Sequence, residues 1–337
     1  MCLAVLVAIA TVWNLLPLFA ATRTQTEVPA IAASGRLFPE LGPGLRALKR
    51  DSIGQYYILA ASSSTVSVYG VDGKRIGEIP AVSSQIVKIV FAEDIDVDAS
   101  NRVFIADLGA NAVKIFKTNG SLDTTVAVPA PTSVAALPGN EFAVTSLRSD
   151  HLVTIYSEQG KLIRSFGGFR DRLSSDDSKR YINHGRLSGD SLGFIYFAFT
   201  LAPDATIRKY DRFGYSAYEI SLPHPDERSA SSSQASGVDI LALARRNQGT
   251  PAKPVINAFG VDSVSQDVWM ATGDLLSHFD KNGALVGSYR TATANGTRLE
   301  PSAILIEPGR ILLASDPVGV YEFSRPDKQS SSSTGQR

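Results

Sequence analysis

The chain has 337 residues, of which 44% are hydrophobic, so it can bury a large core. This length fits either two ordinary domains or one large all-β domain. Lys plus Arg and Asp plus Glu each total 33, which gives a formal net charge of zero. Without a net charge, no long-range field favours nucleic acid or an acidic membrane, so nucleic acid is not expected as a partner.

The N-terminal segment of residues 2–21, CLAVLVAIATVWNLLPLFAA, contains no charged residue. This pattern is typical of a secretory signal or a membrane anchor, so we expect an exported protein, periplasmic or extracellular. Ala20 and Ala21 offer a cleavage site, but the third position upstream is large and no Lys or Arg precedes the segment. Cleavage and retention as an anchor both stay open. Cys2 is the only cysteine, so the folded part contains no disulfide.

A repeated pattern runs through the rest of the chain. Five segments share an apolar residue, two further positions, an aromatic residue, three further positions and glycine: VSVYGVDG (66–73), VKIFKTNG (113–120), VTIYSEQG (153–160), IRKYDRFG (207–214) and LSHFDKNG (276–283). A sixth segment, VYEFSRPD (320–327), keeps the first two columns. A short apolar run precedes each copy and another follows five of them, which predicts units of short strands separated by turns.

Units of about 40 residues with four short strands are typical of propeller blades, which stack because one small sheet cannot bury both of its faces. Six copies therefore predict a single all-β domain, a six-bladed β-propeller of four-stranded antiparallel blades. One aromatic residue recurs in each unit, and we expect it to pack between neighbouring blades. These residues are Tyr69, Phe116, Tyr156, Tyr210, Phe279 and Phe323.

The last unit contains only three apolar runs, at 302–307, 311–315 and 319–324, and is followed by the polar sequence DKQSSSSTGQR. A ring must protect its open edge, so residues from about Ala30 to Phe38 are expected to supply the missing strand beside 319–324. The predicted organisation is a signal or anchor at 1–21, a lead-in with the closing strand at 22–44, the propeller at 45–328 and a disordered tail at 329–337.

The segment IDVDASNRVFIADLGANAVKIFKTNG (95–120) resembles an NHL repeat. The positions that match that family's pattern are Val97, Asp98, Val103, Ile105, Ala106, Asp107, Asn111, Val113, Phe116 and Gly120. Ala112 replaces a usual Arg and Asn101 a usual glycine, and the other units match more weakly. With residues 2–21, the chain is similar to exported bacterial-type propeller proteins of this family. The resemblance implies the architecture, but NHL propellers include scaffolds, ligand-binding sensors and some enzymes.

An acidic residue precedes the second strand of most units, which allows two interpretations. The residues are Asp51, Asp98, Asp190, Asp262 and Glu307. A ring of carboxylates could line a metal site in the central tunnel. However, turn-forming residues follow each of them, as in DSIG and DASN, which favours Asp at the start of a tight turn.

Motifs of other chemistry are lacking in the sequence. No two of the four histidines, His151, His184, His224 and His278, have the three- or four-residue spacing of a local metal clamp. His278 is expected on a strand surface. No G-x-S-x-G nucleophile, P-loop or dinucleotide fingerprint occurs, so we expect no catalytic residue and no cofactor.

The two longest insertions, 167–186 and 222–254, both connect the fourth strand of one blade to the first strand of the next, and therefore lie on the same face. Loops on a rigid scaffold are the usual place for binding. The predicted ligand-binding residues are Arg170, Arg172, Arg180, Tyr181, His184, His224 and Arg228. Solvated insertions without a function remain an alternative interpretation.

These observations predict an exported binding or scaffold protein that recognises a protein, peptide or glycan on the face with both insertions. The alternative is a divalent-metal-dependent hydrolase or lyase with its site in the central tunnel, for which Ca²⁺ is a suitable ion. Membrane contact is expected only through residues 2–21, if that segment is retained.

Overall fold

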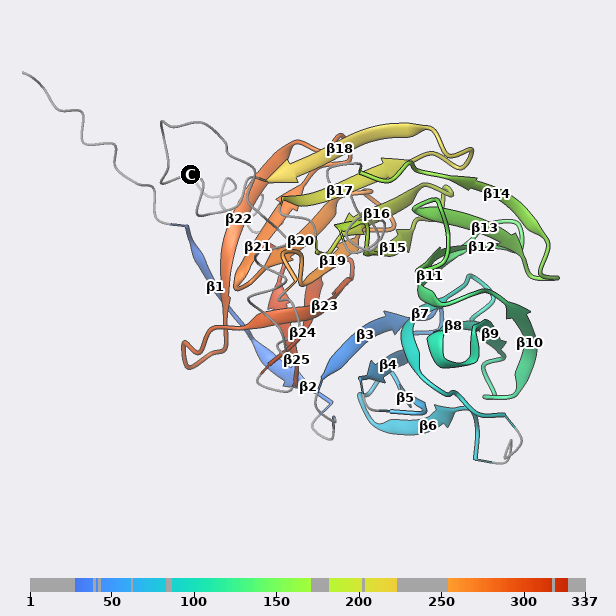
Figure 1. Ribbon diagram of the computed structural model, residues 1–337. Helices are drawn as coiled ribbons and strands as arrows, with labels where there is room; N and C mark the ends of the chain where they lie inside the picture. The colour runs from blue at the N-terminus through green and yellow to red at the C-terminus, as the bar shows by residue number, and fades with distance from the viewer. Residues whose placement is uncertain are drawn as a thin grey trace, which may run out of the picture.

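The computed structural model describes residues 28–38, 41, 44–61, 63–82, 87–170, 182–201, 204–222, 254–316 and 319–326. These residues form six small sheets arranged radially around one axis, which confirms the predicted six-bladed propeller (Figure 1). The predictions for residues 1–21 and 329–337 lie outside the described part of the chain. In the described ranges, no helix has the length and apolar character needed to cross a membrane.

Each blade is an antiparallel meander whose first strand lies nearest the axis. Blades 1 to 3 contain β3 (Leu45–Arg50), β4 (Tyr56–Ala60), β5 (Val66–Tyr69) and β6 (Arg75–Ile79); β7 (Ala92–Val97), β8 (Val103–Asp107), β9 (Ala112–Phe116) and β10 (Leu122–Ala127), with the 3-10 helix η1 (Leu108–Ala110); and β11 (Pro131–Leu137), β12 (Glu141–Ser146), β13 (Val153–Ser157) and β14 (Leu162–Phe166).

Blades 4 to 6 follow the same plan. They contain β15 (Gly185–Gly189), β16 (Ile195–Phe199), β17 (Ala205–Tyr210) and β18 (Ser216–Leu222); β19 (Ala258–Val261), β20 (Val268–Thr272), β21 (Leu275–Phe279) and β22 (Leu285–Ala292); and β23 (Glu300–Ile306), β24 (Arg310–Asp316) and β25 (Gly319–Ser324). The N-terminal strands β1 (Ala30–Ala32) and β2 (Gly35–Leu37) join blades 5 and 6.

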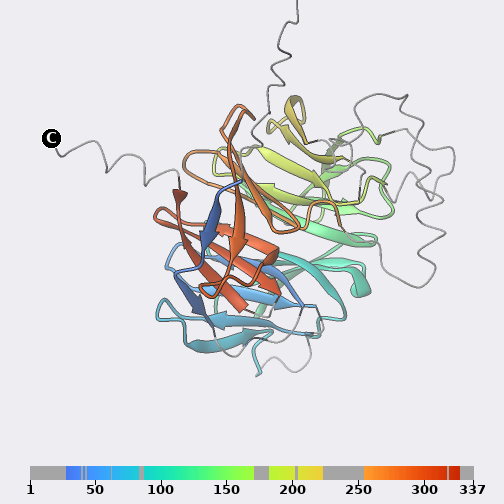
Figure 2. The ribbon, with the colours of Figure 1, turned by 90° about the vertical axis from the view of Figure 1, so that its left-hand side faces the viewer.

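Strand β2 closes the ring. It pairs antiparallel with β25, with Gly35 opposite Glu322 and Leu37 opposite Val320, and so completes blade 6. The predicted closure is therefore confirmed. Figure 2 shows β1 and β2 in dark blue, crossing the outside of the orange and red blades.

The N-terminal segment differs from the prediction in one respect, because it forms two strands in two blades. Strand β1 pairs parallel with β22, with Ala30 opposite Arg290, and gives blade 5 a fifth strand. The chain then steps to blade 6 through Ser34, whose N–H donates to the carbonyl oxygen of Glu322 at 2.8 Å. A parallel partner covers the edge of β22, which the antiparallel meander leaves open.

The cores lie between blades, and the repeat aromatics fill them. Tyr69, Phe116, Tyr210, Phe279 and Phe323 are all buried, each in a cluster shared with the preceding blade. The sixth, Tyr156, is half-buried and stacks on Phe142 with ring centroids 5.8 Å apart. The predicted inter-blade packing is therefore confirmed, and it explains why single blades of this kind need their neighbours.

Tight turns separate the first strand from the second in each blade and, in blades 1 to 5, the third from the fourth. We call the face formed by these turns the lower face, and the opposite face, which carries the connections between blades, the upper face. Asp51 begins one lower-face turn, and its Oδ1 accepts N–H groups of Ile53 at 3.1 Å and Gln55 at 2.7 Å. Asp98, Asp190 and Asp262 accept backbone N–H groups in the same way.

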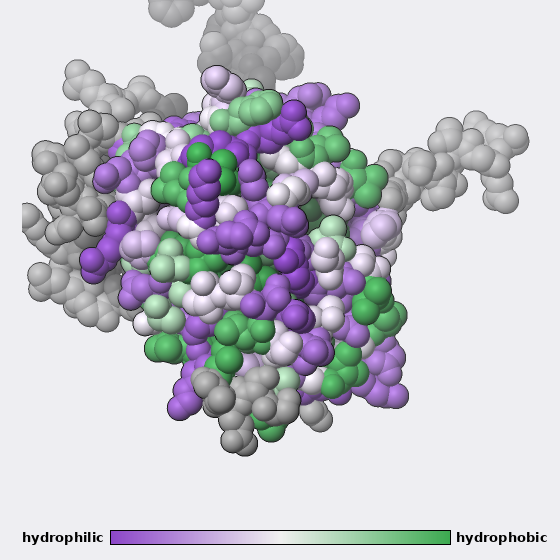
Figure 3. All heavy atoms as spheres, turned by 90° about the vertical axis from the view of Figure 1, so that its right-hand side faces the viewer, coloured by the Kyte–Doolittle hydropathy of each residue, from purple (hydrophilic) through white to green (hydrophobic). Residues whose placement is uncertain are grey.

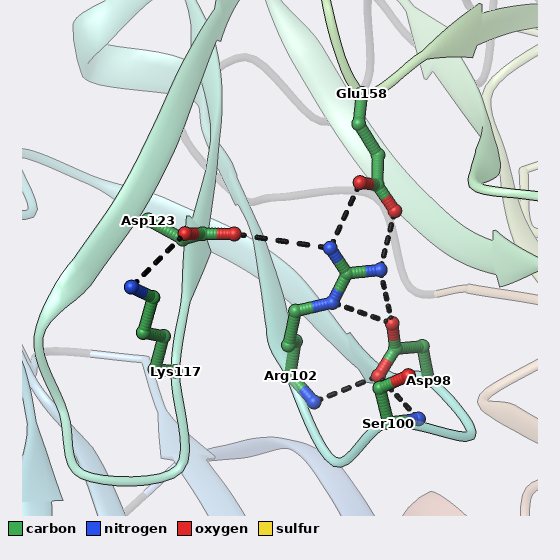
Figure 4. Close-up of polar contacts among 6 residues, drawn as sticks. All are labelled: Asp98, Ser100, Arg102, Lys117, Asp123 and Glu158. Atoms are coloured by element: carbon green, nitrogen blue, oxygen red, sulfur yellow. Dashed lines mark hydrogen bonds and ion pairs between the residues drawn. The ribbon is translucent and has the colours of Figure 1, made fainter.

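Ion pairs join blades on the lower face. Figure 4 shows the Arg102 guanidinium of blade 2 between the carboxylates of Asp98, Asp123 and Glu158, of which Glu158 belongs to blade 3. Its Nη1 lies 2.8 Å from Oε2 of Glu158 and its Nη2 lies 2.7 Å from Oδ2 of Asp98. The hydrogen bond that Arg102 donates to Glu158 is the main cause that raises the pKa of Arg102, so the guanidinium stays charged and holds the two blades together.

The outermost strands expose part of their apolar residues at the rim of the disc. Leu162, Leu285 and Val286 are each 54% exposed. Figure 3 shows hydrophobic residues scattered among hydrophilic ones on the side that it presents. Scattered apolar residues of this kind are normal on a monomeric surface and carry no binding argument.

Phe38 should be essential for ring closure. It follows β2 with a left-handed φ of 51°, a conformation that costs about 1–2 kcal/mol, and its ring packs against Tyr56 and Tyr69 at centroid distances of 5.2 and 4.8 Å. Because Phe38 is 2% exposed, Phe38→Ala should lower the free energy of unfolding by about 3–5 kcal/mol in urea denaturation. The matched change at exposed Phe213, Phe213→Ala, should cost less than about 0.5 kcal/mol; equal losses would contradict this role.

Candidate binding face and central tunnel

The first strands of the blades surround a central cavity of about 90 Å³. Its lining comes from β3, β7, β15, β19 and β23. A water molecule occupies about 30 Å³ in the liquid, whereas pockets for drug-sized ligands measure about 300–1,000 Å³. The tunnel can therefore hold a few waters, but not a peptide or an oligosaccharide.

One half of the tunnel wall is polar and charged, and the other half is apolar. Strands β3 and β7 contribute Arg46, Lys49 and Asp94, whereas β19 and β23 contribute mainly Ala258, Phe259, Val261, Ala303 and Ile304. Lys49 Nζ lies 2.9 Å from Oδ1 of Asp96, and Arg46 pairs with Glu93. The charges neutralise one another within the wall.

Arg186 spans the upper mouth of the tunnel. Arg186 belongs to β15 of blade 4. Its Nη1 donates to the carbonyl oxygen of Arg46 in blade 1, on the opposite side of the ring, at 2.7 Å. A second polar chain runs through three blades, since Leu187 N–H donates to Oγ of Ser133 at 2.9 Å and that hydroxyl donates to Asp94. These contacts fix the inner strands and narrow the tunnel.

Burial acts in opposite directions on the pKa values of two groups in the tunnel wall, Asp94 and Lys49. It raises the pKa of Asp94 above its usual range, and the attraction of Lys49 and Arg186 does not fully compensate. Burial acts to lower the pKa of Lys49, but the carboxylates of Asp96 and Asp94 outweigh it and raise that pKa. The tunnel therefore favours the charged form of Lys49 and disfavours the charged form of Asp94 relative to water.

The acidic column does not converge on the tunnel. Asp51, Asp98, Asp190 and Asp262 are held in lower-face turns, as described above, and Glu307 pairs with Arg50, with a distance of 3.2 Å from Arg50 Nε to Glu307 Oε1. The turn interpretation is therefore confirmed for the four aspartates. Over the described ranges, no group of three or more His, Cys, Asp or Glu residues is placed to hold a metal ion.

The described ends of the first insertion meet on the upper face, between blades 3 and 4. Arg170 N–H donates to Oδ1 of Asn183 at 2.8 Å, and Asn183 Nδ2 donates back to the Arg170 carbonyl at 3.2 Å. The Arg170 guanidinium lies 4.3 Å from the ring centroid of Phe199 and pairs with Glu219 at 2.9 Å. These contacts form a closed neck at the base of the insertion.

His184 lies beside this neck, at the start of β15. Its Nδ1 is 2.8 Å from Oγ1 of Thr200, and burial followed by the charge of Arg186 lowers its pKa. His184 is therefore neutral at pH 7. A cleft of about 20 Å³ is lined by His151, Phe169, Asn183 and His184, so two of the four histidines share one small site.

The predicted site residues divide into two groups. Arg170 and His184 lie close together at the base of the first insertion, on either side of Asn183. Arg172, Arg180, Tyr181, His224 and Arg228 lie outside the described residues.

Sequence reasoning missed the tunnel residues Arg46, Asp94 and Arg186. Each of them is a charged residue within the first strand of its blade. This is the only signal in the sequence, and the repeat pattern gives no reason to expect that such a residue is buried.

His278 corrects a further expectation, because it is buried and not on a strand surface. It is 2% exposed, its ring stacks on Trp269 with centroids 4.0 Å apart, and its Nε2 lies 3.0 Å from Oδ2 of Asp267. The blade 5 core therefore accommodates a histidine by stacking and a carboxylate partner.

Comparison with known proteins identifies the fold and no family. No protein-family model and no curated protein sequence matches the chain. Solved structures that resemble it include a catalytically inactive virginiamycin B lyase from Staphylococcus aureus with quinupristin, at 13% identity, TM-score 0.52, and coverage of 85% of this chain and 82% of that one. The WD40 β-propeller domain of Doa1 has 12% identity, TM-score 0.54, and coverage of 83% and 79%.

Hydrazine synthase from Kuenenia stuttgartiensis also resembles the chain, with 11% identity, TM-score 0.52, and coverage of 87% of this chain and 98% of that one. These three proteins have different functions by name, and the low identities make the likeness one of fold alone. The chain is therefore a six-bladed β-propeller whose function has to be argued from its own residues.

Asp94→Asn tests the charge balance of the tunnel. Because the pKa of Asp94 is raised in the folded state, its contribution to stability is complete below its unfolded pKa of about 3.9 and is lost as pH rises through the folded pKa. Asparagine cannot ionise, so the variant should be more stable than the unmodified chain by about 1 kcal/mol at pH 7, with the difference vanishing near pH 3. Urea unfolding at both pH values measures this.

Asp96→Asn provides the matched control, since it removes the carboxylate that pairs directly with Lys49. This variant should lose about 1–2 kcal/mol at pH 7. If Asp94→Asn were also destabilised at pH 7, attraction to Lys49 and Arg186 would dominate over burial, and the proposed balance would be wrong.

Proposed function

We propose that this chain is an exported binding or scaffold protein that recognises a protein, peptide or glycan on its upper face. The observation that carries the proposal is the narrow tunnel: about 90 Å³ of space, with Arg186 across its upper mouth, leaves no room for such a ligand inside the ring. A large ligand must therefore contact the surface of the disc.

The upper face is favoured because both long insertions begin there. The first joins β14 to β15 and the second joins β18 to β19, so both border blade 4. The neck of Arg170 and Asn183 attaches the first insertion to a rigid base, and a rigid base reduces the entropy lost on binding. The predicted residues Arg172, Arg180, Tyr181, His224 and Arg228 belong to these insertions.

Export is part of the proposal and rests on residues 2–21. This uncharged apolar segment precedes the first described strand, β1, which packs on the outside of the ring and not within it. The NHL-like segment at 95–120 is consistent with the repeat architecture of exported bacterial-type propeller proteins.

The alternative of a metal-dependent hydrolase or lyase receives no support from the carboxylates on which it relied. Four of them are engaged by backbone N–H groups of lower-face turns, and Glu307 by arginine side chains. The likeness to virginiamycin B lyase is one of fold, so it transfers no active site to this chain.

Site-specific photo-cross-linking tests which face binds. A photoreactive residue at exposed Arg148, on the upper face, should form adducts with a protein, peptide or glycan when the chain is incubated with native envelope extract and growth medium. The same residue at exposed Lys281, on the lower face, should form none. Mass spectrometry of the adducts identifies the partner class.

Alanine substitutions then test the predicted residues. The triple variant Arg172→Ala, Arg180→Ala and Arg228→Ala should reduce the Arg148 adduct about fivefold or more, because arginines are frequent binding hot spots. The matched variant Lys161→Ala, Arg212→Ala and Lys281→Ala should leave it unchanged. Adducts that form only from position 281, or resist the first variant, would refute binding on the insertion face.

A further inference from the structure

The lower face carries a group of exposed apolar side chains at the tips of its turns, which we call the apolar tips. The group is Ile53, Val71, Leu192, Phe213, Tyr215 and Val264, and each member is between 59% and 84% exposed. A turn tip that serves only to reverse the chain has no need of a large apolar residue, since Gly, Asn, Asp and Ser suffice. Exposed apolar residues such as Val82 and Val90 also occur in upper-face connections, but the lower face carries more of them, and there they lie at the tips of tight turns.

The apolar tips form two groups, one in blade 1 and one in blades 4 and 5, and within each group neighbouring turns touch. In blade 1, a Cβ on Gly54 would lie 3.0 Å from Cγ2 of Val71, so the turns with Ile53 and Val71 are in contact. In blade 4, a Cβ on Gly193 would lie 3.5 Å from Cβ of Arg212. The Ser191 hydroxyl donates to the Ser263 carbonyl at 3.3 Å, which joins the Leu192 and Val264 turns of blades 4 and 5.

Exposed cations surround these tips. Five successive blades place a Lys or Arg in or beside the turn between their third and fourth strands, namely Lys74, Lys117, Lys161, Arg212 and Lys281, and all are exposed. Lys74 pairs with Asp72 and Lys117 with Asp123, whereas Lys161, Arg212 and Lys281 form no ion pair with a described residue.

Two acidic residues of the turns in blades 4 and 5 are engaged by the backbone of their own turns. Asp211 accepts backbone N–H groups of Phe213 and Tyr215, both at 2.9 Å, and Asp280 accepts those of Asn282 and Ala284. Carboxylates that cap their own turns are half-buried, while the cations beside them remain free to reach outward. Around blades 4 and 5, Arg212 and Lys281 are therefore exposed cations, whereas Asp211 and Asp280 are engaged by backbone N–H groups of their own turns.

We propose that the lower face at blades 4 and 5 rests on a lipid bilayer with anionic headgroups. Leu192, Phe213, Tyr215 and Val264 enter the interfacial region, and Arg212 and Lys281 reach the phosphates. Apolar and aromatic side chains favour this region, and each Lys or Arg near an anionic surface adds to the attraction. Arg212 already lies over the Phe213 ring at 4.7 Å, which presents cation and ring together.

A bilayer is favoured over a second copy of the chain by the N-terminal segment. Residues 2–21 are uncharged and apolar, and Pro29, whose carbonyl accepts from Arg290 N–H at 2.9 Å, fixes the start of β1 on the rim of blade 5. The seven residues between them span at most about 24 Å. Because β1 runs parallel to β22, the chain reaches it from the direction of the lower-face turn before β22, and insertion of residues 2–21 would keep blade 5 within reach of a bilayer.

An environment-sensitive fluorophore on an introduced cysteine tests this contact. In full-length chain with Cys2→Ser, Val264→Cys carries the label on the lower face and Val90→Cys, at a 62% exposed valine of the upper face, is the matched control. With vesicles of phosphatidylcholine and 30% phosphatidylglycerol, the label at 264 should shift to the blue and be quenched by lipid-borne quenchers. The label at 90 should change little.

Charge variants distinguish the lower-face contact from simple anchoring by residues 2–21. Lys281→Ser should reduce the ratio of inserted to free label at 264 roughly fivefold, and Lys281→Ser with Arg212→Ser roughly 25-fold, whereas Arg148→Ser on the upper face should have no effect. Pure phosphatidylcholine should give a small shift only.

Three results would overturn the proposal. In the first, the label at 264 behaves like the label at 90 in anionic vesicles. In the second, the blue shift at 264 is as large in pure phosphatidylcholine as in anionic vesicles. In the third, the label at 264 shifts without vesicles as the protein concentration rises, which would indicate a second copy as the occupant. None of these outcomes changes the upper-face cross-links, so the two proposals fail independently.

Discussion

Closure of the ring by β2 is the constraint on which the other features depend. Each blade packs only against its neighbours, so an open array of six would expose an apolar face at both ends. The first blade is joined to the last by two sets of contacts. Three residue pairs form between β2 and β25, and the Phe38 ring packs against Tyr56 and Tyr69. The two ends then cover each other, and every repeat aromatic has a neighbouring blade to pack against.

A closed ring also divides the connections of the chain between two faces of different character. The lower face consists of short turns that aspartates hold rigidly, and ion pairs such as those of Arg102 join one blade to the next. The upper face carries the connections between blades, and their length is free to vary because no packing requirement limits it. This division offers one face for the proposed ligand recognition and the other for the proposed contact with a bilayer.

The tunnel shows how the ring converts charged residues into structural ones. Lys49, Asp94 and Arg186 sit where the first strands approach one another, and they are partly or fully removed from water. Lys49 pairs with Asp96, Asp94 accepts from Ser133, and Arg186 spans to the Arg46 carbonyl of blade 1, so these side chains narrow the tunnel. The likeness to a lyase is one of fold alone, and the contacts in this tunnel are particular to the residues of this chain.

The periodic features of the fold were predictable from the sequence. The aromatic and glycine columns predicted six blades, and the absence of a fourth apolar run after 319–324 predicted the closing strand. Turn formers after Asp51 and Asp98 predicted their capping role correctly.

Features that depend on contacts between distant residues were not predictable. The three residues Ala30–Ala32 carry no signal for parallel pairing with β22, and His278 looked exposed because the stacking of Trp269 is invisible in a strand pattern. Asp94 and Arg186 were missed for the same reason, since only the closed ring brings blades 1, 2 and 4 together around one cavity.

Disulfide trapping across the closing strand pair tests the account most directly. In a Cys2→Ser background, Gly35→Cys with Glu322→Cys places two cysteines on directly paired residues, whose Cα atoms in an antiparallel ladder lie within bridging distance. Oxidation should form the bridge in nearly all molecules and raise the melting temperature. The control pair, Gly35→Cys with Ser324→Cys, is two residues out of register and should remain reduced. Failure of the first pair, or equal oxidation of both, would contradict a ring closed by β2.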